Sequence, residues 1–285
     1  MTMARRPFHD EPISRIAVWS SRLGLFAFVV AALSIIIVRS NLLEIVPALA
    51  TFAAALVFAG LAILLAFAGF IVIWRQGYSG LGRALLGLFL GLTLLAYPAY
   101  LGTRALKLPA ISDVTTDTAN PPRFDVLARQ RPRDRIDYPG PTVAALQRAG
   151  YPEIAPLELD VAPKAAYDAA LTLVTKRKWL VADTRAPALA RRDGVIEAVA
   201  RTPIMGFRDD VVIRVTPIGP GTRIDVRSAS RVGSHDFGAN ASRIRSLLED
   251  LDDAAGSAPE PRSLPEKKAP PAKKGQPEKR QPTKR

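Results

Sequence analysis

Three long apolar runs near the N-terminus limit most strongly what this chain can fold into. The runs cover Ile16–Val38, Ile45–Trp74 and Ala84–Leu101, and hardly a charged residue interrupts them. A helix needs about 18 to 25 residues to cross a hydrocarbon core about 30 Å thick. The sequence therefore predicts three transmembrane helices, which form a membrane anchor over residues 1–101 and carry a water-soluble C-terminal region.

Ionisable residues are absent from the deep parts of the three runs. Arg22 lies close enough to the start of the first run for its side chain to reach the membrane surface. Proton relays and ion-coupled carriers keep charged groups inside the membrane, so the runs argue against such functions. Small residues recur four positions apart instead: Ala27 and Ala31, Ala55 and Ala59, Gly87 and Gly91. This spacing favours close packing of the three helices within one chain, with a homo-oligomer through the same faces as the alternative.

The distribution of Lys and Arg around the runs predicts the orientation in the membrane. Six lie on the side of the N-terminus, namely Arg5, Arg6, Arg15, Arg22, Arg75 and Arg83, against Arg39, Arg104 and Lys107 on the other side. The side richer in Lys and Arg is normally cytoplasmic. Because three crossings reverse the side, we expect a bacterial inner-membrane protein with a cytoplasmic N-terminus and a periplasmic C-terminal domain.

The positive charge of the chain bears on its partners. The net charge is +13 and the isoelectric point is about 10.4, values that favour nucleic acid in a soluble protein. Residues 254–285 form a basic tail rich in Pro and Lys, which we predict to be disordered. For a periplasmic domain we expect no nucleic-acid partner and consider membrane lipids, an envelope protein or an anionic ligand. An inverted topology would instead favour a cytoplasmic nucleic-acid contact.

The region after the membrane anchor divides by composition into a connector and a domain. Residues 102–153 are rich in Pro and carry one short candidate helix, Val143–Arg148. Residues 154–253 alternate in pattern: one strand, a helix that begins at Pro163, four strand candidates and a final helix. This βαββββα order predicts an α+β domain with an antiparallel sheet covered by two helices on one face. The turn at residues 203–207 is apolar, and either contacts lipid or a partner or is buried.

Several motifs in this domain resemble a bacterial family known as domain of unknown function 1499, in its membrane-anchored subgroup. They are Gly206-Phe207-Arg208-Asp209-Asp210, Arg227-Ser228-Ala229-Ser230-Arg231-Val232-Gly233, Asp236-Phe237-Gly238 with Asn240 and Arg243-Ile244, and, upstream, Asp113-Val114-Thr115-Thr116-Asp117 and Asn120-Pro121-Pro122. The resemblance covers residues 108–251 and implies an envelope protein of no settled activity. Ala162 departs from the family pattern, in which a capping Ser or Asp often precedes the Pro.

The same motifs allow two interpretations of their polar residues. Alternation along Thr222–Val232 places Asp225, Arg227 and Arg231 on one face of the strand. If the preceding strand pairs with it, Arg227 and Arg231 come near Arg208, Asp209 and Asp210. Cross-strand pairs of opposite charge would make a solvated ion-pair ladder, with Asp236 or Asn240 capping the last helix. The functional interpretation is a pocket for a carboxylate or phosphate. Its candidate residues are Arg208, Asp209, Asp210, Arg227, Ser228, Ser230, Arg231, Asp236 and Asn240.

Catalysis, metal binding and cofactor binding have weaker support in the sequence. There is no cysteine, and His235 is the only histidine of the domain. The adjacent Asp209 and Asp210 would point to opposite faces of a strand and could not share a substrate. No nucleophile, phosphate-loop, dinucleotide or metal-ligand motif is present. We therefore expect no cofactor and no metal, and favour a non-catalytic binding domain. The alternative is an envelope enzyme that acts on a polar or lipid substrate through the Arg, Asp and His235 cluster.

Overall fold

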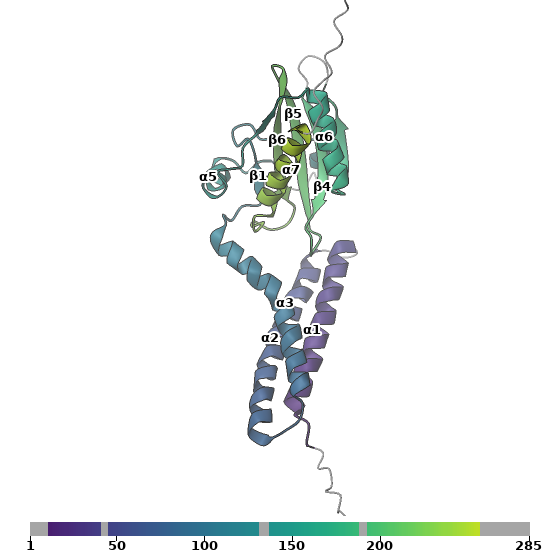
Figure 1. Ribbon diagram of the computed structural model, residues 1–285, viewed down its shortest axis with the longest axis vertical. Coiled ribbons are helices and arrows are strands. Elements are labelled where there is room, and N and C mark those ends of the chain that lie inside the picture. Colours follow the sequence, from purple (N-terminus) through teal and green to yellow (C-terminus); the bar gives the residue numbers. More distant parts are fainter. Residues whose placement is uncertain (1–10, 41–44, 131–136, 188–192, 257–285) are drawn as a thin grey trace, which may run out of the picture.

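The computed structural model describes residues 11–40, 45–130, 137–187 and 193–256. Three long helices form one end of the molecule and a mixed α+β domain forms the other (Figure 1). The helices are α1 (Arg15–Ser40), α2 (Ile45–Gln76) and α3 (Leu81–Lys107), and each is long and apolar enough to cross a membrane. This confirms the three apolar helices that the sequence predicts. Large apolar side chains such as Leu64 and Phe89 stay exposed, as side chains that face lipid would.

Small residues make the contacts between the three helices. The six Ala and Gly residues spaced four apart are all buried within the bundle. A Cβ atom added at Gly87 would lie 2.0 Å from Ser20 Oγ, and one at Gly91 would lie 2.6 Å from Ile63 Cγ1. The helices therefore approach so closely that larger residues would not fit. The small-residue faces are occupied within the single chain, so a homo-oligomer through them would have to compete with this packing.

The bundle separates the start of α1 from the soluble domain. Helix α1 begins at the end of the bundle farthest from the sheet, and α3 ends on the side of the domain (Figure 1). In its upper half α3 bends away from α1 and α2 (Figure 1), and Pro98 lies inside this helix. Proline removes a backbone hydrogen bond and is a common cause of such a bend. Residues 107 to 113 then lead directly into the domain.

The domain contains an antiparallel sheet of six strands. The strands are β1 (Asp113–Thr115), β2 (Leu157–Leu159), β3 (Leu180–Arg185), β4 (Gly194–Arg201), β5 (Arg208–Ile218) and β6 (Gly221–Ser230). Their order is β1-β6-β5-β4-β3, and β2 pairs with the same edge of β6 as β1 does. The tight turn that pairs Ile218 with Gly221 fixes the register of β5 and β6. The predicted α+β class and its antiparallel sheet are confirmed.

Two helices cover one face of this sheet. Helix α6 (Pro163–Lys176) begins at proline, as predicted, and has no side-chain cap at Ala162. Helix α7 (Ala239–Gly256) lies beside it (Figure 1). Apolar residues of the two helices, among them Val174 and Leu247, pack with inward-facing residues of β4, β5 and β6 such as Ile213 and Val226. Because this core fixes the alternation of each strand, it also decides which polar residues lie on the opposite face.

The stretch predicted to be a connector supplies the cover of the opposite face. It contains β1, the short helix α4 (Val126–Gln130) and α5 (Pro141–Gly150). Phe124 and Leu127 pack there on Val199 and Val212. Arg227 and Asp225 are therefore only 2% and 1% exposed. The expectation of a solvated ladder on this face is wrong for these two residues, because β1 and the segment after it return over the sheet.

The β4–β5 turn joins the domain to the membrane helices. Met205, at its tip, is buried against Val38 of α1 and Ala48 of α2, with Phe207 beside them. Arg39, in the last turn of α1, donates from Nη1 to the carbonyl oxygens of Pro203 and Ile204 at 2.7 and 3.0 Å. The apolar turn is thus a docking element of the chain itself, and it holds one end of the sheet against the end of the bundle.

Candidate functional site

The candidate residues from the sequence fall on the two faces of the sheet. Asp209, Ser228 and Ser230 lie on the face covered by the helices, where Asp236 and Asn240 also lie at the start of α7. Arg208, Asp210, Arg227 and Arg231 lie on the opposite face. Asp209 and Asp210 therefore point apart, as alternation predicts. The nine residues do not form one pocket.

The residues on the helix-covered face form a closed polar network. Asn240 Oδ1 accepts from Ser228 Oγ at 2.7 Å, and Asn240 Nδ2 donates to Ser230 Oγ at 3.0 Å. Arg243 forms an ion pair with Asp209 at 2.5 Å, and its Nη1 donates to Ser228 Oγ and Asn240 Oδ1. Burial raises the pKa of Asp209, while the charge and hydrogen bonds of Arg243 oppose this. Sequence reasoning quoted Arg243 in a motif but did not include it in the site.

The backbone amides at the start of α7 are already occupied in this network. Asp236 accepts from the backbone amides of Gly238 and Asn240, both at 2.8 Å. A carboxylate in this position satisfies the unpaired amides of a helix start and interacts favourably with the helix dipole. Asp236 is thus the helix cap, and a ligand anion would have to displace it.

On the opposite face, Arg227 forms a buried ion pair with Asp113. Arg227 Nη2 lies 2.7 Å from Asp113 Oδ2, Nε lies 3.0 Å from Oδ1, and Nη1 donates to the carbonyl oxygen of Pro122. The guanidinium also lies over the rings of Phe124 and Tyr138, 4.8 and 5.6 Å from their centres. Burial raises the pKa of Asp113, and Arg227 acts against this rise. Arg227 therefore forms an ion pair with Asp113 of β1, whereas the sequence pattern had placed it near the carboxylates of β5.

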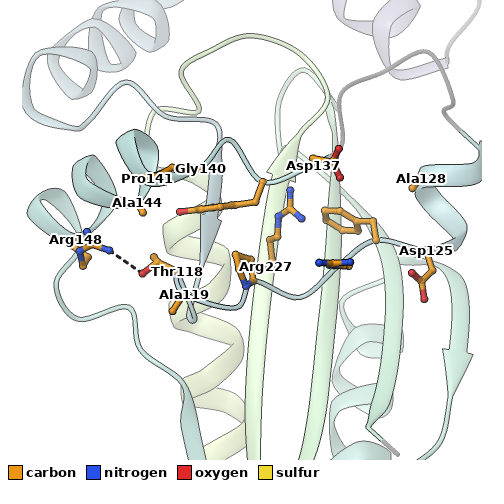
Figure 2. Close-up of a pocket in the computed structure, with 14 residues that line it drawn as sticks. Thr118, Ala119, Asp125, Ala128, Asp137, Gly140, Pro141, Ala144, Arg148 and Arg227 are labelled. Atoms are coloured by element: carbon orange, nitrogen blue, oxygen red, sulfur yellow. Dashed lines mark hydrogen bonds between the residues drawn. The ribbon is translucent and has the colours of Figure 1, made fainter.

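A cavity of about 670 Å³ lies beside this ion pair (Figure 2). Figure 2 shows Arg227 in the middle of the view, with Arg148 and Asp125 at opposite sides. Arg148 donates to Thr118 Oγ1 at 3.1 Å, and Asp125 pairs with Arg185 at 2.6 Å. The lining contains Arg123 and Asp137 as well, so the cavity presents groups of both signs. We call it the mixed cavity, and its charges give no preference for an anion.

A second pocket, of about 530 Å³, lies where the domain meets the membrane helices. Its cationic lining comes from α1, from the α6–β3 turn and from the membrane-side ends of β4, β5 and β6. The lining residues with positive charge are Arg39, Arg177, Lys178, Arg201, Arg208 and Arg231. Among the described residues, no Asp or Glu lines it. We call it the basic pocket, and it contains only two of the nine candidate residues.

Arg208 distinguishes the basic pocket from the mixed cavity. Two cations of the basic pocket already have partners. Arg231 forms an ion pair with Asp210 on the neighbouring strand, and Arg177 forms one with Asp250 of α7, both at 2.6 Å. The half-buried Arg208 side chain has no ion-pair partner within the described part of the chain. Burial lowers the pKa of Arg208, and the positive charges of Arg201 and Arg231 lower it further. A bound anion would relieve this repulsion.

Four of the six cationic residues were outside the predicted site. Arg39 directly follows the first predicted transmembrane run, and Arg177 and Lys178 follow a helix with no motif of their own. A sequence signal existed only for Arg208 and Arg231, which lie in the family motifs. Arg201 meets Arg208 because β4 and β5 pair there, whereas Arg39 reaches them because the β4–β5 turn docks on α1, a contact that no local pattern encodes.

The His235 side chain forms contacts within the turn before α7. Its Nδ1 accepts from the backbone amide of Phe237 at 3.0 Å, and the two rings stack 4.7 Å apart. The histidine stabilises the turn before α7, where Phe237 has a positive φ of 53°. Across the described ranges, no group of three His, Asp or Glu side chains could hold a metal ion.

Comparison with known proteins assigns a family to the domain. A family model described as protein of unknown function (DUF1499) matches residues 113–251, a range that starts at β1 and ends within α7. No curated protein and no solved structure matches this chain. The matched range begins at Asp113 and contains Arg243 near its end. Asp113 forms the buried ion pair with Arg227, and Arg243 forms the one with Asp209. The α+β domain, which follows three helices long and apolar enough to cross a membrane, belongs to the DUF1499 family.

Proposed function

We propose that this chain is a bacterial inner-membrane protein whose periplasmic domain binds an anionic ligand without catalysing a reaction on it. The basic pocket is the observation that carries this function, because six cationic side chains and no described carboxylate line it. Guanidinium groups bind phosphate and carboxylate oxygens with paired, charge-assisted hydrogen bonds. Arg208 supplies a charge that the described part of the fold leaves without an ion pair.

A binding role also agrees with the arrangement of the ionisable groups. Asp209 and Asp210 lie on opposite faces of the sheet, and His235 is held in a turn by its hydrogen bond and ring contact. A general acid and base must reach one substrate together. These three side chains do not converge, so the domain supports binding better than acid-base catalysis.

The periplasmic location is supported by the geometry of the bundle together with the charge count. Helix α1 starts at the end away from the domain (Figure 1), and the N-terminal side carries the larger number of Lys and Arg. Because the chain has no cysteine, single cysteines report topology without background. Lys164→Cys lies on α6, where the lysine side chain is 66% exposed. Gly82→Cys lies at the other end of the bundle, where an added Cβ meets no atom within 4 Å.

Labelling of these two variants in intact cells tests the orientation. A membrane-impermeant maleimide should label Lys164→Cys, and should label Gly82→Cys only after the inner membrane is made permeable. The reverse order of labelling would place the domain in the cytoplasm and contradict the proposed location.

Ligand titrations of the full chain in neutral detergent test the binding function. The probes are glycerol phosphate and a short-chain anionic phospholipid, because both carry a phosphate. Loss of one charge-assisted contact should weaken binding about tenfold in Arg208→Ala. Arg148→Ala removes the same charge from the mixed cavity and should bind like the unmodified chain. Failure of both probes to bind, or equal losses in the two variants, would refute anion binding at the basic pocket.

A further inference from the structure

We infer that the occupant of the basic pocket is an anionic phospholipid of the membrane leaflet next to the domain, an assignment that rests on the proposed anion binding. The headgroup phosphate lies among Arg201, Arg208 and Arg231, and the acyl chains pass Leu180 and Val181 towards the bilayer. Both kinds of residue line the same pocket. The pocket therefore matches an amphiphile better than a small soluble anion.

The position of the pocket relative to the membrane is the first support. Arg39, which lines it, is in the last turn of α1 and so marks the end of a membrane span. Arg201 donates from Nη1 to the carbonyl oxygen of Arg39 at 2.9 Å. The docked β4–β5 turn keeps this end of the sheet against α1 and α2. The cationic side chains are thus held at the level of the lipid headgroups, where each attracts anionic lipid.

Exposed apolar residues on the pocket wall are the second support. Leu180 is 70% exposed and Val181 is 37% exposed on β3, which is the edge strand of the sheet. The half-buried Trp179 precedes them in the same lining. An exposed apolar edge strand is normally protected by charges or by a cover, because it promotes aggregation. Acyl chains beside Leu180 would supply that cover, whereas a soluble phosphate would leave it exposed to water.

The charge balance of the pocket is the third support. Asp210 and Asp250 offset Arg231 and Arg177, but they are not part of the lining. Arg201 and Arg208 meet no carboxylate within 4.0 Å in the described ranges. One lipid phosphate placed between them interacts with at least two guanidinium groups, which suits the fork geometry of arginine.

Co-purification of lipid with the full chain tests the inference. The protein is reconstituted in nanodiscs of phosphatidylcholine and phosphatidylglycerol, transferred to mild detergent, and analysed for retained lipid by native mass spectrometry. The unmodified chain should retain phosphatidylglycerol in preference to phosphatidylcholine. Arg208→Ala should lower this retention about fivefold, the effect of one cation near a membrane surface. Arg148→Ala, in the mixed cavity, is the matched control and should not change it.

Leu180→Ser separates a lipid from a soluble anion, since the leucine is too exposed to contribute much to folding. The substitution should lower phosphatidylglycerol retention about threefold and leave the affinity for glycerol phosphate unchanged. If glycerol phosphate binds as tightly as the lipid and Leu180→Ser changes neither, the lipid assignment is wrong while anion binding stands. If neither phosphatidylglycerol nor glycerol phosphate binds, both proposals fail together.

Discussion

Arg227 and Arg208 lie on the same face of the same sheet, yet their surroundings are opposite. Arg227 is 2% exposed, holds Asp113 with two nitrogens and lies over two aromatic rings. Arg208 is half-buried next to Arg201 and Arg231, and its pKa is lowered by burial and by those like charges. The first arginine is a structural element of the fold, and the second is available for a ligand. Residue type and strand alternation do not distinguish them.

The largest expected effect is on Arg227. Arg227→Ala leaves the Asp113 carboxylate buried without its cation, which should cost about 3–5 kcal/mol of folding free energy. Thermal unfolding of the full chain in detergent, followed by intrinsic fluorescence, measures the loss. The double substitution Asp113→Leu with Arg227→Met removes both charges and should recover much of the stability. Equal instability of the single and double variants would show that packing, and not the ion pair, holds β1 on β6.

A smaller effect concerns the pH dependence of the closed network. Burial raises the pKa of Asp209 in the folded chain above its ordinary value of 3.8. The folded state therefore binds more protons than the unfolded state between the two pKa values, so this group lowers stability as pH rises through that window. Asp209→Asn should flatten the decline in melting temperature between pH 4 and the raised pKa. An unchanged slope would mean that Arg243 offsets the burial of Asp209 completely.

The smallest effect on folding is expected at Arg208. Arg208→Ala should change the unfolding free energy by less than about 0.5 kcal/mol, because the side chain has no ion-pair partner to lose within the described residues. Relief of repulsion from Arg201 and Arg231 should make the change neutral or slightly stabilising. The same thermal unfolding assay measures it, in parallel with the binding titration. A loss comparable to that of Arg227→Ala would place Arg208 among the structural arginines and remove the contrast.

The charged residues of the candidate site show which contacts a sequence pattern can predict. Alternation correctly separated Asp209 from Asp210, and the prediction that Arg231 meets Asp210 across the strands is confirmed at 2.6 Å. The prediction failed for Arg227, because its partner Asp113 is more than a hundred positions away on a strand of three residues. Such a short strand has no period of its own to recognise. It is held on the edge of β6 by backbone pairing, by the ion pair of Asp113 with Arg227, and by hydrogen bonds between Gln147 and the backbone of Thr115.

The sequence alone determined the elements whose signal is local. Apolar length predicted the three membrane helices, small residues predicted their close packing, and changes of period predicted an α+β domain with two helices on one face. Tertiary structure alone decided which polar residues are sealed and which are available. It placed Asp113 and Phe124 against Arg227, and it docked Met205 on α1 and α2, which brings Arg39 to the neighbouring Arg201 and Arg208. The physical reason is that periodicity reports the burial of neighbours along one element, whereas the environment of a charge depends on distant segments that meet only in the folded chain.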